Sequence, residues 1–146
     1  MAKVFLDTNL LLYTVDKQDP DKHEQARRVL KRITCDHVAV ISTQVLQEFY
    51  SAATSKLKLD KMVAKHLLHS FANLETVVAD LALIEQAVDI SALFQLSFWD
   101  SLVVAAAERG NCSYMVTEDL NDGQSIRGVQ VVNPFKNPDF AFADRR

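Results

Sequence analysis

The chain has 146 residues, of which 49% are hydrophobic and 24% charged, with only three Gly and three Pro. This composition is typical of a compact globular protein and excludes disordered and fibrous classes. The formal net charge of −3 also argues against a domain that is basic overall, as nucleic-acid-binding domains commonly are. We expect a single domain over residues 1–146, with a core over 1–134 and a C-terminal tail over 135–146.

The cysteines and the N-terminus indicate a cellular compartment. Cys35 and Cys112 lie far apart and show no CxxC spacing, so we expect both to be reduced core residues. The first residues carry no signal-peptide pattern, and no apolar run reaches the roughly 18 residues that a membrane span needs. These features predict a cytoplasmic protein that does not insert into a membrane.

Apolar strands and amphipathic helices alternate along the chain. The strands are expected at residues 3–7, 38–41, 75–78, 114–117 and 129–132. The helices are expected at residues 8–15, 20–33, 44–56, 61–73, 80–95 and 98–109. Such alternation predicts an α/β fold with a mostly parallel, roughly five-stranded central sheet.

Capping residues and apolar spacing support these helices. Asp19 before Pro20 is a helix-start signature, and Asp60 can cap the helix over 61–73. The spacing of that helix predicts an inward-facing stripe, which comprises Val63, Leu67, Phe71 and Leu74.

Four carboxylates occur where apolar structure surrounds them. Asp7 follows the first strand directly, and Glu48 lies at the edge of the apolar stripe of its helix. Asp100 shares a helix face with apolar residues, and Asp119 follows the strand over 114–117. Ligands of parallel sheets bind beyond the carboxyl ends of the strands. One crevice there could therefore collect all four acids.

Two of these four acids also have a purely structural interpretation. Asp100 fits a capping box with Ser97, and the acidic segment over 118–123 resembles a turn in which Asp122 competes with Asp119 for the fourth position. Thr8 and Asn9 either support the acidic site or cap the first helix.

Four clustered carboxylates imply a cation. Two carboxylates about 4 Å apart repel each other by roughly 4 kcal/mol at an effective dielectric constant near 20. Oxygen ligands without nearby His or Cys favour Mg²⁺ or Mn²⁺, and such ions promote phosphoryl transfer. The sequence has no GxxxxGK[ST], GxGxxG or GxSxG motif, which argues against P-loop, dinucleotide-binding and serine-hydrolase chemistry.

Four sequence blocks together carry a family resemblance, and they read VFLDTNLLLY, STQVLQEFY, SFWDSLVVAAAE and VTEDLNDGQ. In this order they resemble the PIN domain, in particular the small VapC-type toxins. The resemblance implies a three-layer α/β/α fold and a Mg²⁺- or Mn²⁺-dependent endoribonuclease of a type II toxin–antitoxin pair. Hydrolysis by such an enzyme is expected to leave a 5′-phosphate and a 3′-hydroxyl.

The resemblance also implies roles for individual residues. Asp7 and Asp100 would be the direct metal ligands, and Glu48 and Asp119 would complete the catalytic acids. Thr117 fits a small hydroxyl position before the fourth acid. Further implications are a homodimer and a groove for a VapB-like antitoxin, with the helices over 20–33 and 61–73 as candidates for that groove.

Alternative functions remain open at this point. One is a PIN-like nuclease for DNA or structured nucleic acid outside a toxin–antitoxin system, and the other is a non-catalytic protein-binding PIN module. Candidate cations for holding RNA are Arg27, Arg28, Lys31, Lys56, Lys58 and Arg109.

Overall fold

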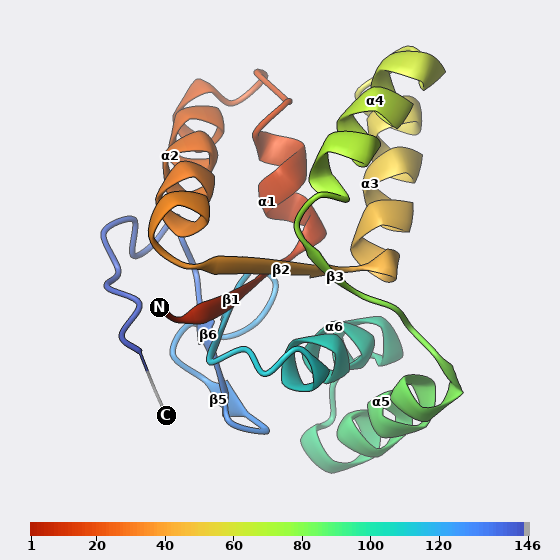
Figure 1. The fold of residues 1–146 in the computed structure, drawn as a ribbon, viewed down its shortest axis with the longest axis vertical. Helices are drawn as coiled ribbons and strands as arrows, with labels where there is room; N and C mark the ends of the chain where they lie inside the picture. Colours follow the sequence, from red (N-terminus) through yellow and green to blue (C-terminus); the bar gives the residue numbers. More distant parts are fainter. Residues whose placement is uncertain (145–146) are drawn as a thin grey trace.

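The structure, a computed structural model, describes residues 1–144 and is built on one six-stranded sheet (Figure 1). The strands are β1 (Lys3–Leu6), β2 (Val38–Ser42), β3 (Glu75–Val77), β4 (Tyr114–Val116), β5 (Ser125–Ile126) and β6 (Val129–Val132). Their order across the sheet is β3-β2-β1-β4-β6-β5.

The central strands are parallel and buried on both faces. Register pairs Phe5 with Val40 of β2 on one side and with Met115 of β4 on the other. All three side chains are fully buried. Continuous apolar runs of this kind are expected of strands that helices cover on both faces, which confirms the predicted α/β class.

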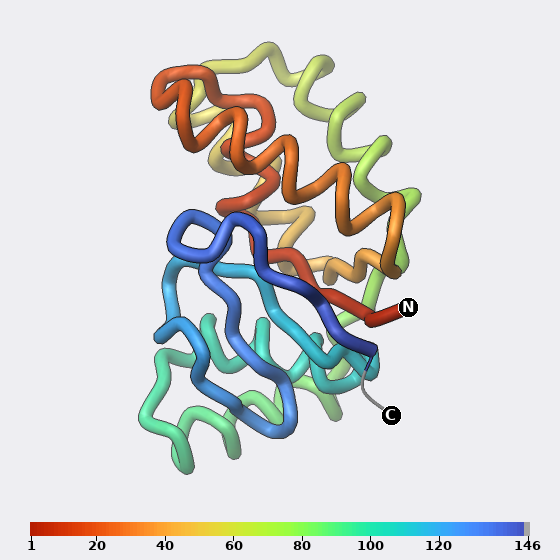
Figure 2. The backbone as a smooth tube through the Cα atoms, turned by 90° about the vertical axis from the view of Figure 1, so that its left-hand side faces the viewer, coloured from red at the N-terminus to blue at the C-terminus, as the bar shows by residue number. Residues whose placement is uncertain are grey.

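Helices form a layer on each side of the sheet, as Figures 1 and 2 show. One layer contains α1 (Thr8–Tyr13), α2 (Pro20–Asp36), α3 (Thr43–Ser55) and α4 (Lys61–Phe71), and the other contains α5 (Leu81–Phe94) and α6 (Phe98–Arg109). Within the described residues no single helix is long and apolar enough to cross a membrane. The pair α5 and α6 reaches that length and hydropathy only when taken together, and its two helices meet at a bend of 116°.

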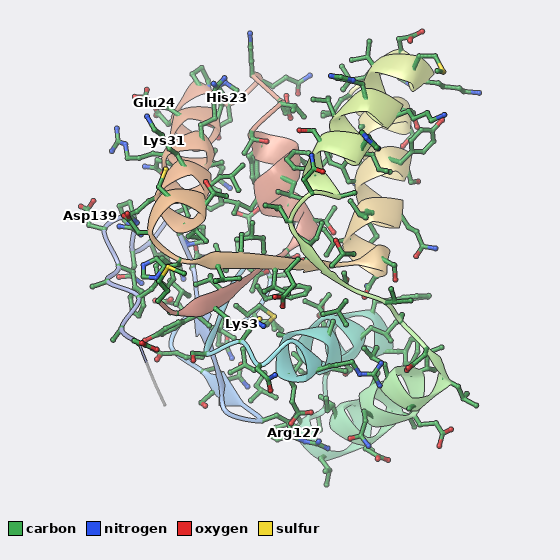
Figure 3. The ribbon with its side chains drawn as sticks, viewed as in Figure 1. Lys3, His23, Glu24, Lys31, Arg127 and Asp139 are labelled. Carbon is green, nitrogen blue, oxygen red and sulfur yellow. The ribbon has the colours of Figure 1, made fainter. Side chains whose placement is uncertain are left out.

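The sheet has six strands where roughly five were predicted, because β5 was missed. β5 is only two residues long and pairs antiparallel with β6 through a turn at Arg127 and Gly128. Both turn residues have positive φ, 53° and 81°, as the tightest hairpins require. An arginine in that conformation gives no turn signal in the sequence. Its guanidinium donates to Gln86 of α5 at 3.2 Å, and Figure 3 labels the side chain.

Two burial predictions were wrong. Val63 was expected to face inward, but it is 51% exposed, and Ala64 is the fully buried residue of that turn. Cys35 was expected in the core and is exposed near the end of α2, whereas Cys112 is buried as predicted. Helix α2 continues to Asp36, beyond its predicted end, which carries Cys35 onto its solvent face.

The C-terminal tail packs along the side of the molecule near the N-terminus, as the tube in Figure 2 shows. Phe142 is only 7% exposed, and it meets the Tyr114 ring edge-on at 5.3 Å. The amino group of Met1 pairs with Asp144 at 3.2 Å. The last two residues of the predicted tail, 145–146, lie outside the described residues.

Strand ends place the first site residues side by side. The Asp7 amide donates to the Val116 carbonyl at the end of β4, at 3.2 Å. The Thr117 amide in turn donates to the Val132 carbonyl at the end of β6, at 3.1 Å. Asp7 and Thr117 therefore lie together at the carboxyl edge of the sheet, as expected for the ligand-binding edge of a parallel sheet.

Candidate active site

All four predicted acids line one open cavity of about 310 Å³. Asp7 reaches it from the end of β1, Glu48 from α3, Asp100 from the first turn of α6, and Asp119 from the segment after β4. The single cationic side chain among the described lining residues is Lys56. The cavity thus concentrates four carboxylates against one ammonium group.

Asp7 is the most enclosed of the four acids, with 8% of its surface exposed. One carboxylate oxygen accepts from the Thr8 amide at 2.7 Å, and the other accepts from the Thr117 hydroxyl at 2.7 Å. Asp7 itself is the N-cap residue of α1, so the alternative in which Thr8 or Asn9 caps this helix was wrong.

Burial raises the pKa of the Asp7 carboxyl from 3.8 to about 6. The hydrogen bonds from Thr117 and Thr8 work against this rise, whereas the nearby charges of Asp119 and Glu48 add to it. The effect of burial on the pKa of Asp7 is therefore larger than that of its two hydrogen bonds. An isolated carboxylate at this position holds its charge at a substantial free-energy cost.

Thr8 and Asn9 each hold a different carboxylate of the cavity. The Thr8 hydroxyl donates to Glu48 at 3.2 Å, and the Asn9 amide donates to Asp119 at 2.7 Å. These two consecutive residues of the first helical turn therefore orient acids that come from α3 and from the segment after β4. The alternative in which they support the acidic site agrees with these contacts.

Asp119 and Asp122 have different surroundings. Asp119 lines the cavity, and its amide donates to the Thr117 hydroxyl at 3.1 Å. Asp122 accepts instead from the backbone amide of Asn133 at 2.8 Å and from the Asn137 side chain. Asp122 thus ties the turn to the segment after β6 and is not among the lining residues of the cavity.

The pKa values of Glu48 and Asp119 are also raised. For each residue the largest cause is partial loss of solvent, and the charge of Asp100 adds to it. Hydrogen bonds oppose the rise, from Thr8 and Gln44 at Glu48 and from Asn9 at Asp119. Both carboxylates are exposed enough to meet a substrate from solvent.

Asp100 lies at the first turn of α6, where Ser97 is the N-cap. The Ser97 hydroxyl accepts from the Asp100 amide at 3.1 Å, as the capping interpretation predicted. Within residues 1–144, however, the Asp100 carboxylate accepts no hydrogen bond, so the reciprocal half of a capping box is not formed. Its charge is left available to the cavity.

The donor set fits a hard divalent cation. Lining carboxylates outnumber lining cations, and three of the four carboxylates have raised pKa values. Among residues 1–144 no three His, Cys, Asp or Glu side chains are placed to hold one ion together. Mg²⁺ in proteins is usually bound by one or two carboxylates and keeps several waters, so a pair of these acids suffices.

The candidate RNA-binding cations lie in different places. Lys56 lines the acidic cavity, whereas Arg109 pairs with Asp80 at 2.7 Å and does not line it. Arg27, Arg28 and Lys31 line a separate depression along α2, on which Figure 3 labels Lys31.

Sequence reasoning missed three contributors to the site. Gln44 is 8% exposed on the cavity wall, and its amide donates to the Trp99 carbonyl at 3.2 Å. Trp99 lines the same cavity with 64% of its surface exposed. Lys22 of α2 pairs at 2.9 Å with Glu118, the neighbour of Asp119. Of these three residues, only Trp99 could have been found from the sequence, because it is an aromatic residue adjacent to one of the predicted acids.

One protein-family profile matches most of the chain. Residues 4–121 match the profile described as the PIN domain. A search of curated proteins found no significant match.

Several solved structures share the fold. A toxin–antitoxin complex from Klebsiella pneumoniae aligns with a TM-score of 0.67 at 18% identity, covering 90% of this chain and 97% of that one. DNA-bound VapBC from Salmonella typhimurium gives 0.64 at 21% identity, with the same coverage. VapC20 of Mycobacterium tuberculosis, described as a sarcin–ricin loop cleaving toxin, gives 0.62 at 20% identity and covers 77% and 86%. At these identities the likeness concerns the fold alone.

Proposed function

The chain belongs to the PIN domain family, and we propose that it is a metal-dependent endoribonuclease serving as the toxin of a type II toxin–antitoxin pair. The observation that carries this proposal is the single cavity lined by Asp7, Glu48, Asp100 and Asp119. Structures with the same fold include a toxin described as cleaving the sarcin–ricin loop and two toxin–antitoxin complexes.

Asp7 and Asp100 would hold the ion, Mg²⁺ or Mn²⁺. When bound, such an ion orients the phosphate and stabilises the charge that develops on it. We assign Asp7 this role because Thr8 and Thr117 each donate to one of its two oxygens and so fix the carboxylate. Each oxygen keeps a second lone pair that can bind the ion. Asp100 is suited to it because no protein donor competes for its carboxylate within the described residues.

We assign Glu48 and Asp119 to the attacking water. Thr8 donates to one oxygen of Glu48 and Asn9 donates to one oxygen of Asp119, which orients both carboxylates. Their raised pKa values favour acceptance of a proton from water, because a base works best when its pKa approaches the working pH. Water attack that expels the 3′-oxygen breaks the P–O3′ bond and leaves a 5′-phosphate and a 3′-hydroxyl, and it does not need the 2′-hydroxyl of RNA.

The cognate antitoxin is the second partner in this proposal. Between α2 and α4 lies a groove of about 540 Å³ whose apolar lining includes Leu30, Leu67 and Phe71, with Arg27 and Lys31 among its polar residues. An apolar segment of a VapB-like antitoxin that carries acidic residues would match this lining. Leu67→Lys should abolish capture of the adjacently encoded antitoxin, whereas Val63→Lys, on the exposed side of α4, should not.

A second copy of the chain is the third partner. The outward face of α5 exposes Leu81, Ile84 and Val88 at helical spacing, with exposed fractions of 70%, 39% and 54%. Monomeric proteins rarely leave such contiguous apolar patches uncovered. A homodimer through α5 would cover this face, and Val88→Asp should shift the sedimentation of the protein to that of a monomer.

Cleavage assays on purified protein test the nuclease proposal. The wild type is incubated with single-stranded RNA, DNA and a chromogenic phosphate ester, in Mn²⁺ and in EDTA. We expect RNA cleavage that needs Mn²⁺ and is lost in Asp7→Asn. RNA cleavage that survives both EDTA and the substitution would exclude this mechanism, and preferential cleavage of DNA would exclude the RNase assignment.

Growth assays test the toxin assignment separately. Expression of the chain without its partner should slow growth, and co-expression of the adjacently encoded antitoxin should restore it. An active RNase that leaves growth unchanged would indicate a PIN nuclease outside a toxin–antitoxin system.

A further inference from the structure

The indole of Trp99 is a large exposed aromatic surface beside the acidic cavity. It is the only tryptophan of the chain and is 64% exposed. Its backbone is held at the first turn of α6, next to Asp100, because its carbonyl accepts from the buried Gln44 at 3.2 Å. Phe98 meets its ring edge-on at 5.3 Å and supports it from the protein side.

A second depression of about 390 Å³ adjoins the acidic cavity at this residue. Its lining residues are Gln44, Gln47, Glu48, Ser51 and Trp99, of which all but Gln47 also line the acidic cavity. The two depressions therefore share a wall, so a ligand that occupies the acidic cavity can extend directly onto the indole.

The chemistry of the second depression suits a neutral, flat group. None of its lining residues is Lys or Arg, and Glu48 is negative, so this surface does not attract phosphate. The side chains of Gln47 and Ser51 make no hydrogen bond within residues 1–144 and are free to pair with the edge of a ring. Aromatic side chains stack on nucleobases irrespective of base identity, because every base has a π face.

We propose that Trp99 is a stacking platform for an unpaired nucleobase adjacent to the scissile phosphate. This inference rests on the proposed nuclease function and concerns the residue that receives the base. Gln47 and Ser51 contact the edge of the stacked base. Gln44 holds the backbone of Trp99 next to the helix that carries Glu48, through its hydrogen bond to the Trp99 carbonyl. Unpaired bases can be stacked in this way, whereas duplex bases are already stacked on one another.

The single tryptophan makes the test site-specific. Indole fluorescence is titrated with a single-stranded RNA and with a duplex of the same sequence, in Ca²⁺ in place of Mg²⁺, with cleavage followed on the same samples. We expect saturable quenching by the single strand and little by the duplex. Equal quenching by both, or none, would overturn the proposal.

Steady-state kinetics in Mn²⁺ provide the second measurement. Trp99→Ala should raise KM for RNA roughly tenfold with little change in kcat, as expected for loss of one stacked base. Trp99→Phe should restore most of the affinity. Leu93→Ala is the matched control, because Leu93 is 71% exposed and lines neither depression.

Three outcomes separate this inference from its premise and from another role for Trp99. RNA cleavage with an unchanged KM in Trp99→Ala would overturn the stacking platform while leaving the nuclease proposal intact. If Trp99→Ala keeps its KM but sediments as a smaller species than the wild type, the indole belongs to an interface between copies of the chain and the proposal is also wrong. Failure of the wild type to cleave RNA would count against the nuclease function itself.

Discussion

Asp7 and Asp100 border the same cavity but are built into the protein in opposite ways. Asp7 is 8% exposed, caps α1 and accepts hydrogen bonds at both oxygens. Asp100 is half-buried, and within the described residues its carboxylate accepts none. Asp7 is therefore part of the fold as well as of the site, whereas Asp100 serves the site alone. Substitutions should therefore separate the two roles.

The largest expected effect comes from Asp100→Ala. Loss of the proposed metal ligand, which would supply several kcal/mol of charge stabilisation through the ion, should lower RNA cleavage on the order of a thousandfold and abolish toxicity in cells. Because no group within residues 1–144 donates a hydrogen bond to the carboxylate, the free energy of unfolding should change by less than about 0.5 kcal/mol. Wild-type toxicity in this variant would count heavily against Asp100 as a ligand.

Asp7→Asn should also abolish cleavage, but it should change the pH dependence of stability as well. The folded-state pKa of Asp7, about 6, lies above its ordinary value of 3.8, so the folded protein binds more protons between these two values. In EDTA the free energy of unfolding of the wild type should therefore fall by about 3 kcal/mol as the pH rises through this window. Asp7→Asn lacks this contribution.

Denaturant unfolding at a series of pH values measures this difference. The stability of Asp7→Asn relative to the wild type should increase from pH 4 to pH 6 and then level off, since Asp7 is by then ionised. Parallel profiles for the two proteins would show that Asp7 is not titrating in this range.

Thr117→Val removes the hydroxyl that links buried Asp7 to the backbone of Asp119. That hydroxyl donates to Asp7 and accepts from the Asp119 amide. We expect a loss of about 1–3 kcal/mol in stability. Cleavage should fall by roughly 10–100-fold, as for other groups that orient metal ligands. Thr117→Ser, which keeps the hydroxyl, is the control, and equal losses in both variants would assign the effect to packing instead.

The smallest expected effect is that of Lys22→Met. Lys22 pairs with Glu118 at 2.9 Å and with the Tyr13 hydroxyl at 3.3 Å, beside the segment that carries Asp119. The pair is partly exposed, so its loss should cost less than about 1 kcal/mol of stability, measured by thermal unfolding. Lys22→Arg should behave as the wild type. If Lys22→Met loses as much stability as Thr117→Val, the segment that carries Asp119 is held mainly by its ion pair with α2 and not by the Thr117 hydroxyl.

Much of the fold follows from local pattern. The alternation of apolar strands with capped helices predicts the α/β sheet, and Asp19, Asp60 and Ser97 cap the helices that follow them. These predictions succeed because a cap or an amphipathic face depends on residues within a few positions of one another. Strand β5 and the exposure of Val63 were not predictable in this way, since each depends on what packs against it.

The sequence was sufficient to predict the four acids, their places after strands or on helices, and the resemblance to the PIN domain. The pairing of each donor with its carboxylate depends on the tertiary structure. Thr8 reaches Glu48 across 40 residues, and Asn9 reaches Asp119 and Thr117 reaches Asp7 across 110 residues each. Parallel strands that are adjacent in a sheet are distant in the chain. The pairing of β1 with β2 brings Thr8 close to Glu48, and the pairing of β1 with β4 brings the first acid and Asn9 close to the segment after β4.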